Sequence, residues 1–217
     1  MEWPLLAVLD EDERRRVLAL ASRRRFAKGE PLFHEGDPGD TMHLIAKGHV
    51  ALRVTTPLGD TATLLVLGPG DHFGEMALIS PAPRNASAVA LEPVETMTVH
   101  REQLEELRHD HPGVDRLLME GLIAEVRRLS HALLDALYIP VEKRVLRRLG
   151  DLLALYRDGP ADTVTIPLTQ EDVAEMAGTT RPTANKVLKA AEEAGAVRIA
   201  RGRIDVLNAD ELARRAR

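Results

Sequence analysis

The pattern of apolar and polar residues divides the chain into a helical beginning, a β-rich middle and a helical second half. Residues 5–22 carry apolar side chains around an acidic turn and predict one or two short helices. From Arg24 to His100, short β-prone runs separated by glycines have the spacing of a small antiparallel barrel or jelly roll. The expected strands are 31–33, 42–45, 50–54, 62–67, 86–89 and 96–99.

The β-rich region contains one turn recognisable by composition and a single break in its pattern. Residues 35–39 have the composition of a turn, Glu-Gly-Asp-Pro-Gly. Residues 74–79 favour a short helix, because they contain good helix formers such as Glu, Met, Ala and Leu.

A short helix is expected over 101–111, and a longer one from about Gly113 to Tyr138. In the longer helix, apolar residues recur at alternating spacings of three and four, which is typical of a heptad seam: Met119, Leu122, Val126, Leu129, Leu133 and Ala136. This regularity favours a dimer helix. The alternative is a helix that only packs on its own domain.

The long helical pattern ends at a proline. Pro140 lacks an N–H donor and restricts the conformation of Ile139, so Tyr138, Ile139 and Pro140 form a candidate hinge. Helix is expected to resume as far as about Tyr156, and residues 158–162 are expected to form a loop.

The segment 169–189 has the features of a helix-turn-helix. Thr169 and Asp172 have the spacing of a capping box, Gly178 can adopt the positive φ of a turn, and Pro182 falls in the first turn of the second helix. The alternative is an ordinary helical hairpin with solvated charges. The agreement of caps, turn and polar face favours the helix-turn-helix.

The second helix of this motif presents side chains that suit a DNA groove. Arg can pair with guanine, Asn can pair with adenine, and hydroxyls can meet phosphates. The candidate residues are Thr180, Arg181, Thr183, Asn185, Lys186 and Lys189. Two further β-prone runs, 197–200 and 204–206, predict a two-stranded wing whose tip carries Arg201 and Arg203.

Charge and composition narrow the classes of function. The net charge is −5, but residues 140–217 hold 14 Lys and Arg against 12 Asp and Glu, a net charge of +2, which fits separate partners for the two halves. Cysteine is absent, which excludes disulfides, thiol catalysis and cysteine-bound metal clusters. The spacing of His109 and His111 is poor for a metal site, and we predict none. With no apolar span and no signal peptide in the sequence, we expect a cytoplasmic protein without a membrane partner.

The residues best suited to bind a ligand gather between positions 73 and 90. Glu75 offers a carboxylate, Arg84 offers a guanidinium, and the start of the short helix offers free backbone N–H groups. This combination suits a ribose that carries a phosphate.

Taken together, the chain resembles the cyclic-AMP receptor protein/FNR superfamily of bacterial transcription regulators over nearly all of its length. The resemblance implies an α+β fold with an N-terminal cyclic-nucleotide-binding β-barrel or jelly roll, a long dimerisation helix and a C-terminal winged helix-turn-helix. The implied domains are residues 1–112, 113–139 and 140–217. The resemblance implies no enzyme activity. It implies three partners: double-stranded DNA, a second copy of the chain and RNA polymerase.

The resemblance assigns roles to residues of the cassette. Glu75 corresponds to the carboxylate that accepts from the ribose 2′-OH, and Arg84 to the guanidinium that binds the cyclic phosphate. In the family, the N–H groups at the start of a short helix face the phosphate and the sugar. The corresponding residues here are Gly74, Glu75, Met76 and Ala77. Asn85 stands where many bacterial cyclic-AMP binders have Ser or Thr, and its amide can still donate to a phosphate oxygen.

Two departures from the family pattern concern specificity. The family meets adenine with a Thr-Ser pair from two subunits, whereas the corresponding segment here offers Ser130 as its one hydroxyl and His131 as the other partner for a base edge. In the second helix of the helix-turn-helix, Arg181 and Lys186 match two arginines, but Pro182 replaces a glutamate that reads cytosine, so the preferred half-site should differ.

The sequence therefore predicts a homodimeric, sequence-specific DNA-binding transcription regulator under allosteric control by a cyclic nucleotide, with cyclic AMP as the expected effector. One alternative is an effector-independent regulator of the same family in which Glu75 and Arg84 form a structural pair. A remote alternative is a cyclic-nucleotide regulatory module of an enzyme or channel. The segment after residue 140 has neither the length of a kinase domain nor the apolar span of a pore.

Overall fold

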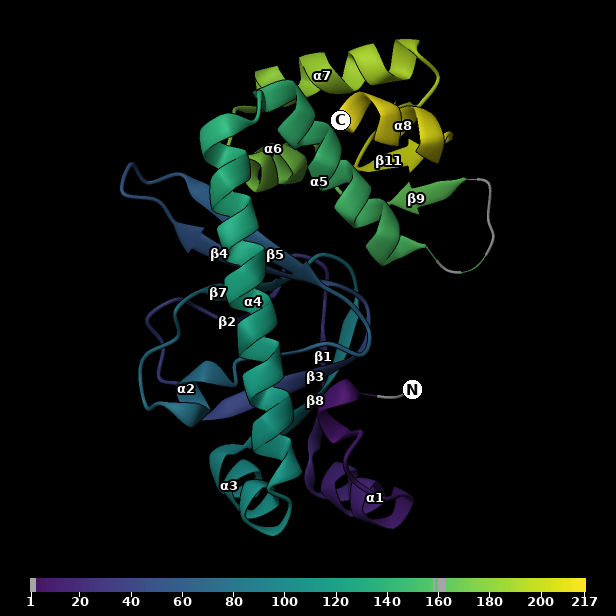
Figure 1. The fold of residues 1–217 in the computed structure, drawn as a ribbon. Coiled ribbons are helices and arrows are strands. Elements are labelled where there is room, and N and C mark those ends of the chain that lie inside the picture. The colour runs from purple at the N-terminus through teal and green to yellow at the C-terminus, as the bar shows by residue number, and fades with distance from the viewer. Residues whose placement is uncertain (1–2, 158, 160–162) are drawn as a thin grey trace. The chain divides into compact units, whose positions relative to one another are not determined.

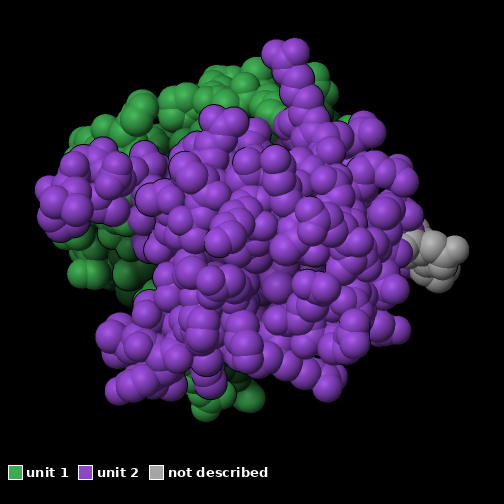
Figure 2. All heavy atoms as spheres, turned by 90° about the horizontal axis from the view of Figure 1, so that it is seen from above, with its two compact units in different colours: residues 1–54, 66–129 green, residues 55–65, 130–217 purple. Residues whose placement is uncertain are grey.

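The structure is a computed structural model that describes residues 3–157, 159 and 163–217 (Figure 1). The chain divides into two compact units, Met1–Val54 with Val66–Leu129 and Thr55–Leu65 with Ser130–Arg217, which Figure 2 colours separately. The α+β fold class expected from the sequence is confirmed.

The first unit begins with two short helical segments, η1 (Pro4–Leu6) and α1 (Glu11–Leu20). Asp10 starts α1 as a capping box, because its side chain accepts from the backbone N–H of Glu13 at 2.8 Å while the Glu13 carboxylate accepts from the N–H of Asp10 at 2.8 Å. The sequence predicts one or two short helices over residues 5–22, and the structure has two.

Eight strands form two four-stranded sheets with the orders β1-β8-β3-β6 and β2-β7-β4-β5. Their bounds are β1 Ser22–Phe26, β2 Pro31–Phe33, β3 Thr41–Lys47, β4 Val50–Thr55, β5 Thr61–Leu67, β6 His72–Phe73, β7 Ser87–Ala90 and β8 Val94–His100. All six strands expected from the sequence are present. The short helix expected at 74–79 is also present, as α2 (Met76–Ile79).

Sequence periodicity missed β1 and β6. Strand β1 reads Ser-Arg-Arg-Arg-Phe and has no apolar alternation. It pairs with β8 along its whole length through the antiparallel ladder, and Arg23 and Arg25 add cross-strand charge pairs with Glu95 of β8. Strand β6 has only two residues, too few for a period.

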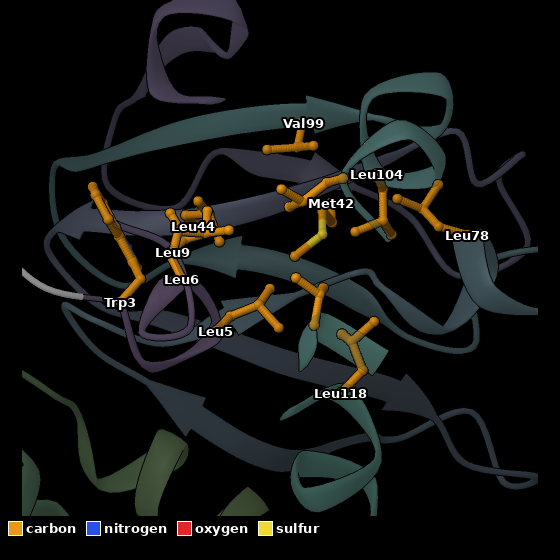
Figure 3. Packing of buried hydrophobic residues seen from close by; sticks show 12 residues of the cluster. Trp3, Leu5, Leu6, Leu9, Met42, Leu44, Leu78, Val99, Leu104 and Leu118 are labelled. Atoms are coloured by element: carbon orange, nitrogen blue, oxygen red, sulfur yellow. The ribbon is translucent and has the colours of Figure 1, made fainter. Parts of the chain in front are cut away.

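The core of the first unit joins the barrel to the helices that follow it (Figure 3). Helix α3 (Arg101–Asp110) contributes Leu104, and helix α4 (Gly113–Tyr138) contributes Leu118. Trp3 lies at the edge of this cluster and its indole N–H donates to the Ile45 carbonyl at 3.0 Å. The predicted bounds of both helices are confirmed to within a residue.

Beyond its first turns, α4 exposes a long series of apolar side chains. Met119, Val126 and Leu133 are 61%, 63% and 60% exposed, and all three belong to the predicted heptad seam. The other large apolar residues exposed on this helix are Ile123, Leu129, Leu134, Leu137 and Tyr138. Exposed large apolar residues that recur along one helix are typical of an interaction surface.

The second unit contains α5 (Val141–Tyr156), α6 (Gln170–Ala177), α7 (Arg181–Glu193) and α8 (Ala209–Ala216). A small sheet with the order β10-β11-β9 is built from β9 (Val164–Ile166), β10 (Val197–Ala200) and β11 (Arg203–Val206). The two wing strands expected from the sequence are confirmed.

The second unit also differs from the sequence prediction. The wing has a third strand, β9, whose three residues Val-Thr-Ile show too little pattern to identify a strand. Helix α8 was not expected, although Asn208 caps it by accepting from the N–H of Glu211 at 2.9 Å. The loop expected at 158–162 lies, except for Gly159, outside the described residues.

Candidate nucleotide-binding site and DNA-reading surface

Strand β6 leads directly into Gly74, and only glycine fits at this position. The φ angle of Gly74 is +85°, in the left-handed region. A Cβ atom there would lie 2.7 Å from Nη1 of Arg84 and 3.1 Å from the Thr41 carbonyl oxygen. The glycine therefore allows the backbone before α2 to approach the arginine closely.

Arg84 is held at this point by backbone and side-chain oxygens. Its Nη1 donates to the Gly74 carbonyl at 2.9 Å, and its Nη2 donates to the Thr41 carbonyl at 2.6 Å and to Thr41 Oγ1 at 3.0 Å. Its own backbone is fixed to the turn predicted at 35–39, because its N–H donates to the Asp37 carbonyl at 2.8 Å and its carbonyl accepts from the N–H of Gly36 at 2.8 Å. The fold itself therefore holds the guanidinium in place.

An aromatic cluster lies beneath the guanidinium. The Arg84 Cζ atom is 4.1 Å from the centroid of the Phe33 ring, a cation–π contact, and the Phe33 ring is 5.8 Å from that of Phe73. His43 stacks on Phe73 with ring centroids 5.2 Å apart, and Phe26 meets His43 edge to face. All three phenylalanines of the chain belong to this cluster.

Burial, together with the nearby positive charge of Arg84, lowers the pKa of His43 to about 3. The imidazole is therefore neutral at physiological pH, and its Nδ1 lies 3.1 Å from Thr96 Oγ1. His43 supports the cluster as a neutral ring and adds no second positive charge beneath Arg84.

Arg84 has no carboxylate partner in the described part of the chain. Arg84 is 4% exposed, and its buried Nε has no hydrogen-bond acceptor among the described residues. Burial lowers the pKa of Arg84, while Asp40, Asp37 and Glu75 act in the opposite direction through space. The structural ion pair between Glu75 and Arg84, on which the effector-independent alternative was based, is not formed between these described residues.

The start of α2 supplies further donors. Within the described part of the chain, the backbone N–H groups of Glu75, Met76 and Ala77 have no protein acceptor, whereas those of Leu78 and Ile79 both donate to the Glu75 carbonyl at 2.9 Å. N–H groups without a protein acceptor are donors suited to an anionic oxygen.

The structure brings the predicted residues 74–77 and Arg84 together. Asn85 is exposed next to them, with its Nδ2 3.7 Å from the Met76 sulfur. Ser130 is exposed on α4 and belongs to the second unit, so its role stays a prediction. Sequence reasoning missed Thr41 and Phe33 as supports of Arg84, because neither a carbonyl nor a ring contact leaves a charge signal in the sequence.

The helix-turn-helix in the second unit is confirmed in its local geometry. Thr169 accepts from the N–H of Asp172 at 3.2 Å, and the Asp172 carboxylate accepts from the N–H of Thr169 at 2.7 Å. Gly178 has a φ angle of +58° in the turn, and Pro182 lies in the first turn of α7. The two helices share a core of Val173, Ala174, Ala177, Ala184, Val187 and Leu188.

Most of the predicted DNA-reading residues lie on the open face of α7. Thr180, Arg181, Lys186 and Lys189 are exposed, and Thr183 is half-buried with its hydroxyl 3.0 Å from that of Thr180. Asn185 is placed less favourably, because its Oδ1 is buried and accepts no hydrogen bond. The helix therefore offers its basic residues more openly than its amide.

At the wing tip, Arg201 and Arg203 are both exposed. Arg203 also forms an ion pair within the wing, since its Nε lies 3.5 Å from the buried carboxylate of Asp205. The same carboxylate accepts a hydrogen bond from the Thr165 hydroxyl at 2.8 Å. Arg201 extends from the tip beside Gly202.

The candidate hinge is bridged by arginines of α5. Pro140 precedes α5, and Arg144 donates to the carbonyls of Ile139 and Ala177, each at 3.1 Å. Arg147 donates to the Asp135 carboxylate near the end of α4 at 2.6 Å. The end of α4 and the helix-turn-helix are thus both tied to α5.

Comparison with known proteins agrees with this organisation. The Cyclic nucleotide-binding domain family matches residues 23–111, and the Crp-like helix-turn-helix domain family matches residues 143–215. Fold and site together define a DNA-binding transcription regulator with a cyclic-nucleotide domain.

The relatives identify the family. The chain is 37% identical to the Cyclic AMP receptor protein of Thermus thermophilus, over 95% of this chain and 93% of that protein. It is 33% identical to the CRP-like cAMP-activated global transcriptional regulator of Mycobacterium tuberculosis, over 88% of this chain and 87% of that protein. The crystal structure of the Thermus thermophilus Catabolite Activator Protein is 36% identical, covers 98% of each chain and gives a TM-score of 0.55. The chain belongs to the cyclic-AMP receptor protein/FNR family of transcription regulators.

Two further properties bear on other classes of function. None of the described helices is both long enough and apolar enough to cross a membrane. Among residues 3–157, 159 and 163–217, no three His, Asp or Glu side chains are grouped so as to hold a metal ion.

The fit of Gly74 can be tested by adding one methyl group. Gly74→Ala should cost about 1–2 kcal/mol for the positive φ and about 1–3 kcal/mol more for the clash with Arg84. Gly29→Ala is the matched control, because Gly29 has a φ of +81° with no atom within 4 Å of its added Cβ. Denaturant unfolding of both variants measures the difference, and equal losses would show that Arg84 does not depend on this glycine.

Proposed function

We propose that this chain is a homodimeric transcription regulator that binds a cyclic nucleotide, with cyclic AMP as the first candidate, and reads DNA through α7 and the wing. The observation that carries the proposal is Arg84, a buried guanidinium without a carboxylate partner, next to three free N–H groups. A buried, unpaired charge is costly, and a bound phosphate would compensate it.

Each residue of the cassette has a chemical task in this proposal. Arg84 and the N–H groups of residues 75–77 bind the oxygens of the cyclic phosphate, because both are donors that match an anion. Glu75 accepts from the ribose 2′-OH, and its half-buried carboxylate is free of any ion pair with Arg84. Asn85 adds an amide donor at the rim. The names of the relatives from Thermus thermophilus and Mycobacterium tuberculosis support cyclic AMP over other nucleotides.

Dimerisation would bury the apolar surface of α4. The exposed residues recur in the register of a two-helix seam, so two copies of α4 can cover each other. Ser130 lies on the same helix and would meet the base of the nucleotide, with His131 next to it. The complete site would then require a second copy of the chain.

The binding signal would reach DNA through the hinge at Tyr138, Ile139 and Pro140. We assign residues 1–112 to the effector domain, 113–139 to the dimer helix and hinge, and 140–217 to the DNA-binding domain. A cyclic nucleotide would favour one of two arrangements of these domains, and in that arrangement the two α7 helices would match major grooves about 34 Å apart. RNA polymerase is the partner expected from the family.

The nucleotide half of the proposal can be tested by titration calorimetry. The wild-type protein should bind cyclic AMP more tightly than cyclic GMP, and Arg84→Leu should weaken cyclic-AMP binding by about 100-fold, because a charge-assisted contact to the phosphate is lost. Arg15→Leu on α1 is the control, since Arg15 is exposed and far from the cassette in sequence. Absence of heat with both nucleotides and an unchanged DNA affinity would refute this half.

The dimer is tested with a charge in the seam. Val126→Glu should convert the dimer into monomers in sedimentation equilibrium, because it would bury a carboxylate between two apolar helices. Ala124→Glu introduces the same side chain at an exposed position outside the seam and should leave the mass unchanged. A wild-type protein of monomer mass, or a Val126→Glu variant of dimer mass, would contradict the seam.

The DNA-reading face is tested on a duplex selected from random sequence by the wild-type protein. Arg181→Ala should cost about 1–3 kcal/mol on this duplex and relax the preference at one base pair. Lys189→Ala should weaken binding to all sequences alike and reduce the salt dependence. A loss that is uniform across sequences in both variants would mean that α7 does not read bases through Arg181.

A further inference from the structure

Helix α2 ends with carbonyl groups that its own backbone cannot satisfy. The N–H of Ser80 donates to the Met76 carbonyl at 3.0 Å and closes the single turn. The next donor in an α-helix would be the N–H of residue 81, but Pro81 has none. The carbonyls of Ala77 and Leu78 therefore need a donor from elsewhere in the fold.

Arg101, the first residue of α3, supplies these donors. Its Nη2 donates to the Ala77 carbonyl at 2.8 Å, and its Nη1 donates to the Leu78 carbonyl at 2.8 Å. A planar guanidinium can meet two neighbouring carbonyls at once, and a positive charge is favourable at the C-terminal end of a helix. Apolar packing brings the same two helices together, since Leu78 and Leu104 belong to one core cluster (Figure 3).

The same guanidinium also holds the turn that fixes Arg84. Nη2 of Arg101 donates to the Gly39 carbonyl at 2.7 Å, and the backbone N–H of Arg101 donates to the Asp40 carbonyl at 3.0 Å. A few residues earlier in the same turn, the backbones of Gly36 and Asp37 form hydrogen bonds with the backbone of Arg84. The turn and α2 are in tight contact, because a Cβ on Gly39 would lie 2.2 Å from the Cβ of Ala77.

We propose that Arg101 is a positioning residue for the nucleotide site: it ties the end of α2 to the turn at residues 36–40 and so holds the Gly74–Ala77 backbone in place against Arg84. The role deepens the proposed function and rests on it. Arg101 touches neither Arg84 nor the free N–H groups, so it acts through the two segments that carry them. Because Arg101 also begins α3, a shift of α2 on binding would be felt directly at the start of the helical segment that leads to α4.

The test compares Arg101→Gln, Arg101→Lys and the control Arg108→Gln in the full chain. Arg108 lies on the same helix but pairs with Asp115 instead of contacting α2. We expect Arg101→Gln to weaken cyclic-AMP binding about tenfold in calorimetry and to raise amide exchange at Leu78, Ile79 and Ser80 about tenfold in the ligand-free protein. Arg101→Lys should give an intermediate effect, because one ammonium group cannot donate to all the carbonyls that the guanidinium contacts. The control Arg108→Gln should match the wild type.

The readouts separate failure of this role from failure of the proposed function. A wild-type protein that binds neither cyclic AMP nor cyclic GMP refutes the proposed function, and the exchange data then decide on Arg101 alone. Unchanged exchange at residues 78–80, or a cyclic-AMP affinity equal to that of the wild type, would overturn the positioning role. A rise in exchange spread evenly over the barrel would also overturn it, since that would indicate general destabilisation. If Arg101→Gln does not fold, Arg101→Lys carries the same comparison.

Discussion

The site depends on one physical condition, a buried guanidinium whose two Nη atoms donate to neutral oxygens instead of a carboxylate. The carbonyls of Gly74 and Thr41 accept from the two Nη atoms of Arg84, and its Cζ lies over the ring of Phe33. Carbonyl dipoles lower the cost of burying the charge but do not cancel it. The positive charge therefore remains available to an anion, whereas an internal ion pair would have had to break first.

This condition explains several otherwise separate features of the barrel. Gly74 must lack a side chain because Arg84 occupies the space where its Cβ would lie. His43 remains neutral, because burial lowers its pKa and the charge of Arg84 lowers it further. The turn at 36–40 holds the backbone of Arg84 so that its side chain needs little reorganisation on binding. Preorganisation of this kind lowers the entropic cost of binding a small ligand.

The sequence predicted what local chemistry determines. The capping box at Thr169, the turn at Gly178 and the helix boundary at Pro140 depend on residues within a few positions of each other, and the structure confirms all three. Strand β1 was missed because its run of arginines carries no apolar period. Strand β9 alternates as Val-Thr-Ile, but over three residues only. Helical spacing also placed Asn185 on the open face of α7, whereas packing in the second unit buries its Oδ1.

The chemistry of the cassette was predicted only in part, for a related reason. Glu75 and Arg84 are conspicuous as charges, and their proximity in sequence suggests that they pair. The partners of Arg84 include Thr41, which is 43 positions away and contributes mainly a backbone carbonyl. Almost every residue type carries the same backbone carbonyl. The amino-acid sequence therefore cannot show which carbonyl will accept from Arg84 before the fold is known.

Arginine side chains meet backbone carbonyls at three places where this chain leaves regular structure. Arg84 meets the carbonyl of Gly74, Arg101 meets the carbonyls that Pro81 leaves without donors, and Arg144 meets the carbonyl of Ile139 before Pro140. Each of these places is a joint at which glycine or proline interrupts the backbone hydrogen bonds, and each lies in a segment to which function is assigned. A carbonyl capped by a side chain can change partner without the loss of a helix or a strand. Such joints can therefore be stable in one arrangement and still give way to another when a ligand changes the balance.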